Sequence, residues 1–320
     1  MTKVALAQIA PVLLDREKTL ARAIDAVREA GAAGAALIAF GEALVPGYPL
    51  WVERTDGAIF ESPIQKDYFA LYCEQAVCIE RGDLAPFCAA CRDAGLVAVL
   101  GVIERPMDRS GHTVYASRVV VDGRSVAGGR AGRVLSVHRK LMPTHEERLV
   151  WGIGDGHGLV AHPVGEWTLG ALNCWENWMP LARAALYAQG VDLHVAIWPG
   201  SDRNTRDITR FIALESRSFV VSVGSITRHG DIPAHLPARE RVSRPGDTLC
   251  NGGSCVAAPD GSWVLEPVVN TEGVFFAEID HREVGRARHS FDPTGHYSRP
   301  DVLRVLVDRR RLGGAEFVDA

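Results

Sequence analysis

Short apolar runs alternate along the chain with longer segments in which apolar positions recur every three or four residues. The short runs are typical of buried β-strands, and the longer segments are typical of amphipathic helices. The predicted strands cover residues 4–9, 35–40, 97–103, 117–121, 135–138, 167–172, 193–198, 219–223 and 273–279. The predicted helices cover residues 15–30, 66–94 with a break near 82–83, 181–188 and 205–218. Strands that alternate with helices predict an α/β protein, and this pattern alone allows a doubly wound parallel sheet.

Three polar residues stand at the C-terminal ends of predicted strands. They are Glu42, Lys140 and Cys174. Sites of open α/β sheets form at such strand ends. A thiol placed between a strand and a helix is held rigidly near backbone N–H groups, which favours a nucleophilic cysteine. Each residue also has a plain structural interpretation, as a loop carboxylate, a surface base and a buried apolar thiol.

The remaining segments are predicted as loops and one hairpin. Alternating glycines between residues 152 and 158 lack the spacing of a phosphate-binding loop and predict a solvent-exposed loop. Residues 229–246 are rich in Pro and Arg and predict another loop, whereas 252–265 predict a hairpin. The polar tail from residue 286 onward has little core of its own and is a candidate interface arm.

Composition and charge exclude several classes of partner. The 320 residues are 47% hydrophobic and 23% charged, which suits a globular protein with an ample core. The net charge is −4 without a block of like charge, so we expect neither nucleic acid nor an anionic membrane as partner. No uncharged apolar run reaches the roughly 18 residues of a membrane helix. The first residues resemble a strand rather than a signal peptide.

The seven cysteines are an odd number and predict free thiols in a reducing compartment, which we take to be the cytoplasm. Cys88 and Cys91 have the spacing of a redox pair or half a zinc site. No second pair with suitable spacing follows, so we interpret them as core residues of a helix. The histidines between 138 and 162 fall on different faces or in loops. We therefore expect no metal and no other cofactor.

The three strand-end residues and their flanks resemble the nitrilase superfamily of carbon–nitrogen hydrolases. The catalytic residues of that family are a Glu, a Lys and a Cys in this chain order. The matching stretches are Phe40-Gly41-Glu42-Ala43 with Pro46-Gly47-Tyr48-Pro49, Arg139-Lys140-Leu141-Met142-Pro143-Thr144, and Leu172-Asn173-Cys174-Trp175-Glu176, with a further match at Gly295-His296-Tyr297-Ser298-Arg299-Pro300.

Finer features resemble the nitrilase branch. Trp and Glu after the Cys are typical of nitrilases, whereas amidase relatives commonly carry Tyr and Asp there. In the nitrilase form a second acid precedes an Arg, and Glu147 before Arg148 matches it. The adjacent Glu146 leaves an alternative for this second acid.

The resemblance implies a four-layer α-β-β-α sandwich with two packed sheets. It implies a carbon–nitrogen hydrolase domain over residues 1–285 and a C-terminal extension over 286–320 that contacts other subunits. The family forms dimers by pairing helices, and helix 181–188 suits such a contact. The dimers often extend into larger spirals.

The chemistry expected from this set is hydrolysis of a nitrile. Glu42 would take the proton of Cys174, whose sulfur attacks the nitrile carbon to give a thioimidate. Lys140 would stabilise the anionic or tetrahedral species, and Glu147 would orient Lys140 or bind substrate. Water would then release ammonia, and a second water would release the carboxylic acid.

Four aromatic residues near the strand ends are predicted to shape a substrate pocket. They are Tyr48, Trp51, Trp175 and Trp198. Ordinary core packing is the alternative for each. Two other functions remain open: an amidase or cyanide-hydrolysing enzyme with the same residues, and a catalytically silent scaffold on the same fold.

Overall fold

Two β-sheets form the centre of the molecule in the computed structural model, which describes residues 1–124 and 131–313. The first sheet has the spatial order β13 (Gly273–Ile279), β1 (Thr2–Gln8), β2 (Leu37–Phe40), β3 (Val97–Glu104), β4 (Tyr115–Asp122) and β5 (Arg133–Arg139). Strands β1, β2 and β3 are parallel, and β13, β4 and β5 pair antiparallel at the two sides.

The second sheet repeats this plan. Its spatial order is β10 (Ile226–Arg228), β11 (Thr248–Ala257), β9 (Phe219–Gly224), β8 (Leu193–Trp198), β7 (Trp167–Asn173) and β6 (His162–Val164), with β12 (Trp263–Val269) paired to β11. Strands β7, β8 and β9 are parallel. All three parallel strands of each sheet are buried along nearly their whole length, as expected for strands that are covered on both faces.

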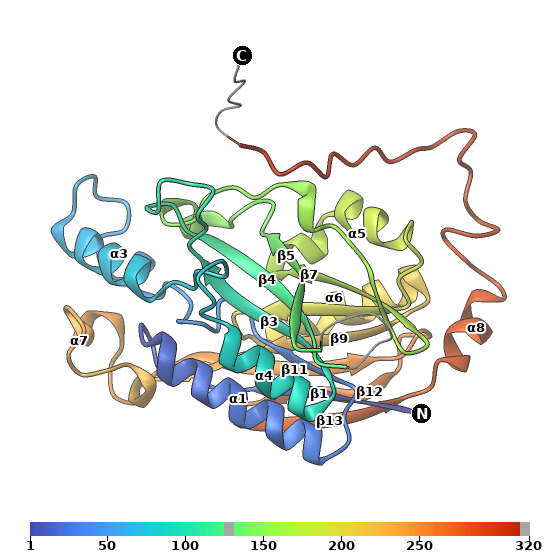
Figure 1. Ribbon diagram of the computed structural model, residues 1–320, viewed down its shortest axis with the longest axis horizontal. Helices are drawn as coiled ribbons and strands as arrows, with labels where there is room; N and C mark the ends of the chain where they lie inside the picture. Colours follow the sequence, from blue (N-terminus) through green and yellow to red (C-terminus); the bar gives the residue numbers. More distant parts are fainter. Residues whose placement is uncertain (125–130, 314–320) are drawn as a thin grey trace.

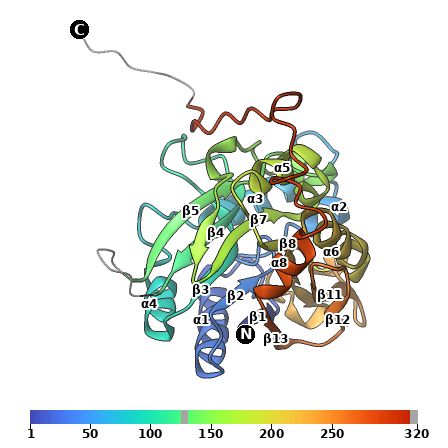
Figure 2. The same cartoon turned by 90° about the vertical axis from the view of Figure 1, so that its right-hand side faces the viewer.

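Helices cover the outer faces of both sheets (Figures 1 and 2). Helices α1 (Arg16–Ala32) and α4 (Ala85–Ala94) pack on the first sheet, and α6 (Asp202–Ser216) packs on the second. Helix α5 (Pro180–Tyr187) is tied to α6 by an ion pair of 2.6 Å between Arg183 and Glu215. The inner faces of the sheets share one apolar cluster, to which β1–β4 contribute from one side and β7–β9 from the other. The fold is the predicted four-layer α-β-β-α sandwich.

The other helices are short or peripheral. They are α2 (Trp51–Arg54), α3 (Pro63–Gln75), α7 (Arg239–Val242) and α8 (Arg282–Arg288), with 3-10 turns η1 (His145–Leu149), η2 (Gly156–Gly158), η3 (Cys174–Trp178) and η4 (His229–Asp231). No helix in the described ranges is long and apolar enough to cross a membrane.

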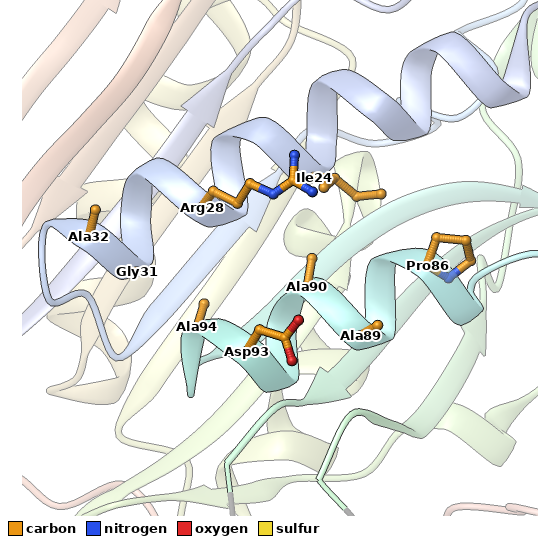
Figure 3. Close-up of a pocket in the computed structure, with 9 residues that line it drawn as sticks. All are labelled: Ile24, Arg28, Gly31, Ala32, Pro86, Ala89, Ala90, Asp93 and Ala94. Carbon is orange, nitrogen blue, oxygen red and sulfur yellow. The ribbon is translucent and has the colours of Figure 1, made fainter.

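Helices α1 and α4 approach closely because small residues face each other between them (Figure 3). A side chain on Gly31 would bring its Cβ within 2.7 Å of the Cβ of Ala94, so this crossing requires glycine. A surface groove follows the crossing and is lined by Ile24, Arg28 and Asp93 among others. It contains none of the residues at the strand ends.

The predicted strands and major helices are confirmed, with ends that shift by a few residues. The predicted long helix is interrupted as expected, because α3 ends at Gln75 and α4 begins at Ala85. Cys88 and Cys91 lie buried in α4 as free thiols, which confirms the core interpretation. The hairpin predicted at 252–265 is formed by β11 and β12.

Two loop predictions were wrong in part. Residues 229–246 contain the 3-10 turn η4 and the short helix α7. The glycines between 152 and 158 do not form a free solvent loop, because they pack on the end of β5. Gly154 donates its N–H to the carbonyl of Lys140 (2.8 Å), and Gly158 lies against the backbone of His138.

The chain beyond α8 runs along the outside of the molecule (Figure 1). Its described part, up to residue 313, contains turns but no helix or strand. The end of this part is fastened near η2, where Arg311 pairs with Asp155 (3.1 Å) and His157 contacts the carbonyl of Arg309 (3.1 Å).

Candidate active site

The two sheets each contribute part of one buried polar cluster. Glu42 follows β2 and Lys140 follows β5 in the first sheet, whereas Cys174 follows β7 in the second. The N–H of Glu42 donates to the carbonyl of Trp198 at the end of β8 (3.0 Å), which joins the sheets beside the cluster. The structure therefore brings together the three residues that the strand-end argument selected.

Lys140 lies at the centre of this cluster. Its Nζ is 2.9 Å from Oε1 of Glu42 and 2.6 Å from Oε2 of Glu147. The ring of Trp151 covers the ammonium at 5.2 Å. All three ionisable side chains are at most 2% exposed, so their charges interact with little screening by water.

Glu147, and not Glu146, is the second acid that contacts the lysine. Glu147 lies in η1, where its carboxylate closes a capping box by accepting the N–H of Thr144 (2.6 Å). It also accepts the hydroxyl of Tyr48 (2.9 Å). Glu146 contacts the same hydroxyl from the outside (3.1 Å) and pairs with His145, which is exposed.

Cys174 begins the 3-10 turn η3 and has a left-handed backbone conformation, with φ of 48°. This conformation is uncommon for a residue with a side chain and needs support from its surroundings. The side-chain amide of Asn177 gives that support by donating to the carbonyls of Leu172 (3.2 Å) and Cys174 (2.9 Å). The sharp turn at the end of β7 places the sulfur against the acidic cluster.

Burial raises the pKa of the Glu42 carboxyl to about 8; Lys140 opposes this shift and Glu147 adds to it. Burial also holds the pKa of the Cys174 thiol well above its ordinary value, against the effect of the Lys140 charge. Burial by itself lowers the pKa of Lys140, but the neighbouring acidic groups outweigh burial and raise it. The site therefore combines a permanent ammonium with a carboxyl that titrates near neutral pH, where acid–base catalysts are most effective.

The same cluster is the one group of three potential metal ligands within residues 1–124 and 131–313. Carboxylate oxygens of Glu42 and Glu147 and the sulfur of Cys174 lie within 4.8 Å of one another. The ammonium of Lys140 lies against both carboxylates, so it already supplies the positive charge there. A metal ion would have to approach this ammonium, which is unfavourable.

Comparison with known proteins shows to which family the chain belongs. The sequence profile of the family described as carbon–nitrogen hydrolase matches residues 3–289. The chain belongs to the carbon–nitrogen hydrolase family. An aliphatic nitrilase from Sinorhizobium fredii is 37% identical over 313 residues, which cover 96% of each chain. A bifunctional nitrilase/nitrile hydratase from Lupinus angustifolius is 32% identical over 99% of this chain and 89% of the relative. These relatives place this carbon–nitrogen hydrolase in the nitrilase branch.

Solved structures of carbon–nitrogen hydrolases share its fold. A carbon–nitrogen hydrolase from Helicobacter pylori superimposes with a TM-score of 0.69 at 18% identity, covering 94% of this chain and 96% of the other. An amidase from Nesterenkonia sp. gives a TM-score of 0.65 at 18% identity, covering 90% and 94%. At 18% identity, these similarities show a shared fold and nothing further.

The four predicted pocket residues of this hydrolase lie in different environments. Tyr48 contacts the acidic cluster, as described above. Trp51 is fully buried and stacks on Tyr68 at 5.0 Å, as in the core-packing alternative. Trp198 is also fully buried, whereas Trp175 is 48% exposed and faces Trp178 at the surface. Their contact with substrate remains a prediction.

Sequence analysis used Glu176 only as a mark of the nitrilase branch and gave His138 no role, and it missed that both are buried beside the site of this hydrolase. Nε2 of His138 lies 3.1 Å from both carboxylate oxygens of Glu176. Glu176 also accepts the N–H of Asn173 (2.8 Å), which completes a capping box at η3. The spacing of an Asn followed three residues later by a Glu is the signature of such a box and was the available signal.

Proposed function

We propose that this carbon–nitrogen hydrolase is a nitrilase, which converts an organic nitrile and two water molecules into a carboxylic acid and ammonia. The observation that carries the proposal is the buried ammonium of Lys140, held between the carboxylates of Glu42 and Glu147, which each have an oxygen within 4.8 Å of the sulfur of Cys174. The 37% identity to an aliphatic nitrilase over nearly the whole chain supports nitriles as the substrate class.

In the first step, Glu42 accepts the proton of the Cys174 thiol as the sulfur attacks the nitrile carbon. One π bond of the nitrile breaks, and its nitrogen takes that proton back from Glu42. The product is a thioimidate, in which carbon is bonded to sulfur and doubly bonded to N–H. Lys140 stabilises the negative charge that develops on nitrogen, and the dry site strengthens this interaction.

In the second step, a water molecule adds to the thioimidate carbon while Glu42 accepts a water proton. Glu42 returns this proton to the nitrogen, so the tetrahedral species carries one hydroxyl and one amino group. Glu42 then transfers the hydroxyl proton to the amino nitrogen as the carbon–nitrogen bond breaks, so that ammonia leaves and a thioester remains on Cys174. A second water molecule hydrolyses the thioester, which releases the acid and regenerates the thiol. Protons and electron pairs balance without an external oxidant or reductant.

Glu147 keeps Lys140 in place through these steps. It holds the ammonium at 2.6 Å and is itself fixed by Thr144 and by the hydroxyl of Tyr48. Such a network fixes the direction of the charge before the reaction, which is the source of electrostatic catalysis.

We also propose that copies of the chain associate through the outer surface of α5 and α6 together with the adjoining turn η3. Large apolar side chains are exposed there: Trp175, Trp178, Met179, Leu181, Phe211 and Leu214. An exposed apolar patch of this kind favours a protein contact. The tail beyond residue 286 is proposed to extend such contacts into larger assemblies. It exposes Val302, Leu303, Val305 and Leu306.

The proposed site of action is a reducing compartment, the cytoplasm. All seven cysteines are free and buried, including the proposed nucleophile. A nucleophilic thiol and six structural thiols persist without oxidation where cellular reductants are abundant.

The experiment that tests the function is ammonia release from a panel of aliphatic, aromatic and arylaliphatic nitriles, the matching amides and cyanide. The Cys174→Ala variant is expected to lose activity while keeping its circular dichroism spectrum. Cys88→Ala, at a buried thiol in α4, is the control that should remain active. Release from amides alone would assign an amidase, and no release from any compound would favour the silent scaffold.

A further inference from the structure

The reacting groups come from two different sheets, so their separation depends on what joins the sheet ends. Lys140 follows β5 of the first sheet and Cys174 follows β7 of the second. A shift of about 1 Å between reacting groups can reduce a rate about a hundredfold. The contacts that bridge these two strand ends therefore matter for the reaction.

Glu176 is bonded to both strand ends. On the side of the first sheet, Oε1 accepts the backbone N–H of Leu141, the residue after Lys140. On the side of the second sheet, Oε2 accepts the backbone N–H of Asn173, the residue before Cys174, at 2.8 Å. The two oxygens of one carboxylate thus hold the immediate neighbours of the ammonium and the thiol.

His138 holds this carboxylate from a third side, and the charge of Arg118 lies near it. Nε2 of His138, two residues before Lys140, lies 3.1 Å from each oxygen. Arg118, opposite His138 in the neighbouring strand, is fully buried and adds positive charge near Glu176. Glu176 and His138 are themselves no more than 1% exposed. A buried carboxylate with this many donors has one well-defined orientation.

We propose that Glu176 is a positioning residue that sets the distance between Lys140 and Cys174 by clamping the two strand ends. The assignment rests on the contacts and is consistent with the proposed reaction, but the clamp would operate on the thiol and ammonium whatever their substrate. Glu176 does not touch the reacting atoms in this scheme. It acts through the backbone on either side of the site.

The clamp requires a carboxylate of this length. A carboxylate has two acceptor oxygens, so it can receive N–H groups from opposite sides, whereas an amide has only one acceptor oxygen. Glu176→Gln therefore keeps the size of the side chain but breaks one of the two bridges. Glu176→Asp keeps both acceptors but is shorter by one methylene and cannot reach both strand ends.

The test compares these two variants with a matched carboxylate at the opposite end of β7. Asp192 accepts the N–H of Thr168 (2.7 Å) and contacts His281 (2.8 Å), so it also joins a backbone N–H to a histidine. Asp192→Asn breaks the same kind of contact far from Cys174. Melting temperatures of all variants report the structural effect of each loss.

Two readouts separate positioning from general stability. In nitrile hydrolysis, kcat of Glu176→Gln and Glu176→Asp is expected to fall about a hundredfold with KM changed less than about threefold. Asp192→Asn is expected to keep kcat within about threefold despite a similar fall in melting temperature. The rate at which iodoacetamide alkylates Cys174, followed by mass spectrometry of its peptide, is expected to fall at least tenfold in the Glu176 variants alone.

The alkylation rate distinguishes failure of the clamp from failure of the proposed function, because it needs no nitrile. Equal losses of kcat or of alkylation in Glu176→Gln and Asp192→Asn would overturn the clamp. Wild-type alkylation and turnover in Glu176→Gln would overturn it as well. If Glu176→Gln does not fold, Glu176→Asp and His138→Gln carry the same comparison, and unchanged alkylation of Cys174 in both would reject the proposal.

Discussion

Glu42 has a buried carboxyl whose oxygens accept no hydrogen bond from the described residues, although Lys140 is 2.9 Å away. Burial raises its pKa to about 8. The proposed base is the deprotonated form, and its fraction increases as the pH rises. We therefore expect kcat/KM to rise about tenfold per pH unit below pH 8 and to level off above it. Initial rates of ammonia release at low substrate concentration between pH 6 and 10 measure this profile.

The control for this prediction is Glu42→Gln, which cannot accept the thiol proton. We expect it to lose activity by a factor of about 100 or more at every pH. A wild-type profile that is flat between pH 6 and 9 would contradict the assignment of Glu42 as the base. Deprotonation of Lys140 does not lower kcat/KM in this range, because the neighbouring acidic groups raise the pKa of Lys140 further above its ordinary value.

Tyr48 connects the cluster to the protein surface with a single hydroxyl. That hydroxyl lies 2.9 Å from Glu147 and 3.1 Å from Glu146, but it has only one proton to donate. Removing it in Tyr48→Phe leaves the buried carboxylate of Glu147 short of one donor. A hydrogen bond to a charged group contributes about 1.5–3 kcal/mol, so kcat/KM is expected to fall roughly tenfold to a hundredfold.

Steady-state kinetics of Tyr48→Phe beside Tyr68→Phe test this role. The hydroxyl of Tyr68 donates to the carbonyl of Pro237 (2.6 Å) and does not contact Glu147, so its loss should affect stability more than rate. Glu146→Gln should also retain most activity, because Glu146 contacts the cluster only through Tyr48. Near-equal rates for the two tyrosine variants would argue that the Tyr48 hydroxyl has no part in holding Glu147.

At the level of elements, the end of β5 is shaped by the glycine-rich segment that lies against it. A Cβ on Gly154 would overlap the carbonyl oxygens of Arg139 and Lys140. Gly154→Ala must therefore displace the strand end, and Lys140 with it, from its present position. We expect a loss of about 1–3 kcal/mol in the free energy of unfolding, with a larger relative loss in kcat.

Chemical denaturation and kinetics of Gly154→Ala check this expectation, and Gly230→Ala is the matched control. A Cβ on Gly230 meets nothing within 4 Å. Full activity in Gly154→Ala would show that the end of β5 tolerates displacement, and that the site does not depend on this packing.

The positions of most strands were predictable because these strands are compact apolar runs with polar flanks. The short edge strands β6 and β10 lack such a run and were not predicted. The same pattern identified Glu42, Lys140 and Cys174 as candidates, because a charged or reactive residue directly after an apolar run is easily recognised. The pairing of strands was not predictable from the runs. Both sheets mix parallel and antiparallel neighbours, and the apolar run of β2 carries no mark of its partners β1 and β3.

The features that were missed depend on contacts distant in the sequence. Gly154 appeared to belong to a free loop. It must be glycine because a side chain there would overlap the carbonyl of Arg139 at the end of β5, and this contact is not visible in the sequence. Glu176 is charged, so its near-complete burial was not expected from composition. Its partners His138 and Leu141 lie 38 and 35 residues away. The family resemblance identified the sandwich, which hydrophobic periodicity did not distinguish from a single sheet.

At the scale of the whole molecule, the outer surface of α5 and α6 is the proposed contact between subunits. Leu181 is 70% exposed and Phe211 is 45% exposed. The double variant Leu181→Asp/Phe211→Asp places charge in this contact and should shift the protein toward monomers in light scattering after size-exclusion chromatography. Val264→Asp, at an exposed position on β12, should leave the mass unchanged. An unaltered mass in the double variant would contradict the proposed interface.

Strand β1 has one neighbour from the start of the chain and one from near its end. It pairs with β2 on one side and with β13, residues Gly273–Ile279, on the other. A ribosome must therefore make all of residues 9–272 before it begins β13, which covers the outer side of β1. During that time β1 presents unpaired backbone groups, the kind of edge to which other nascent chains bind. The need for chaperones and the yield in cells should thus depend on how late β13 is made, although β13 supplies none of the proposed catalytic residues.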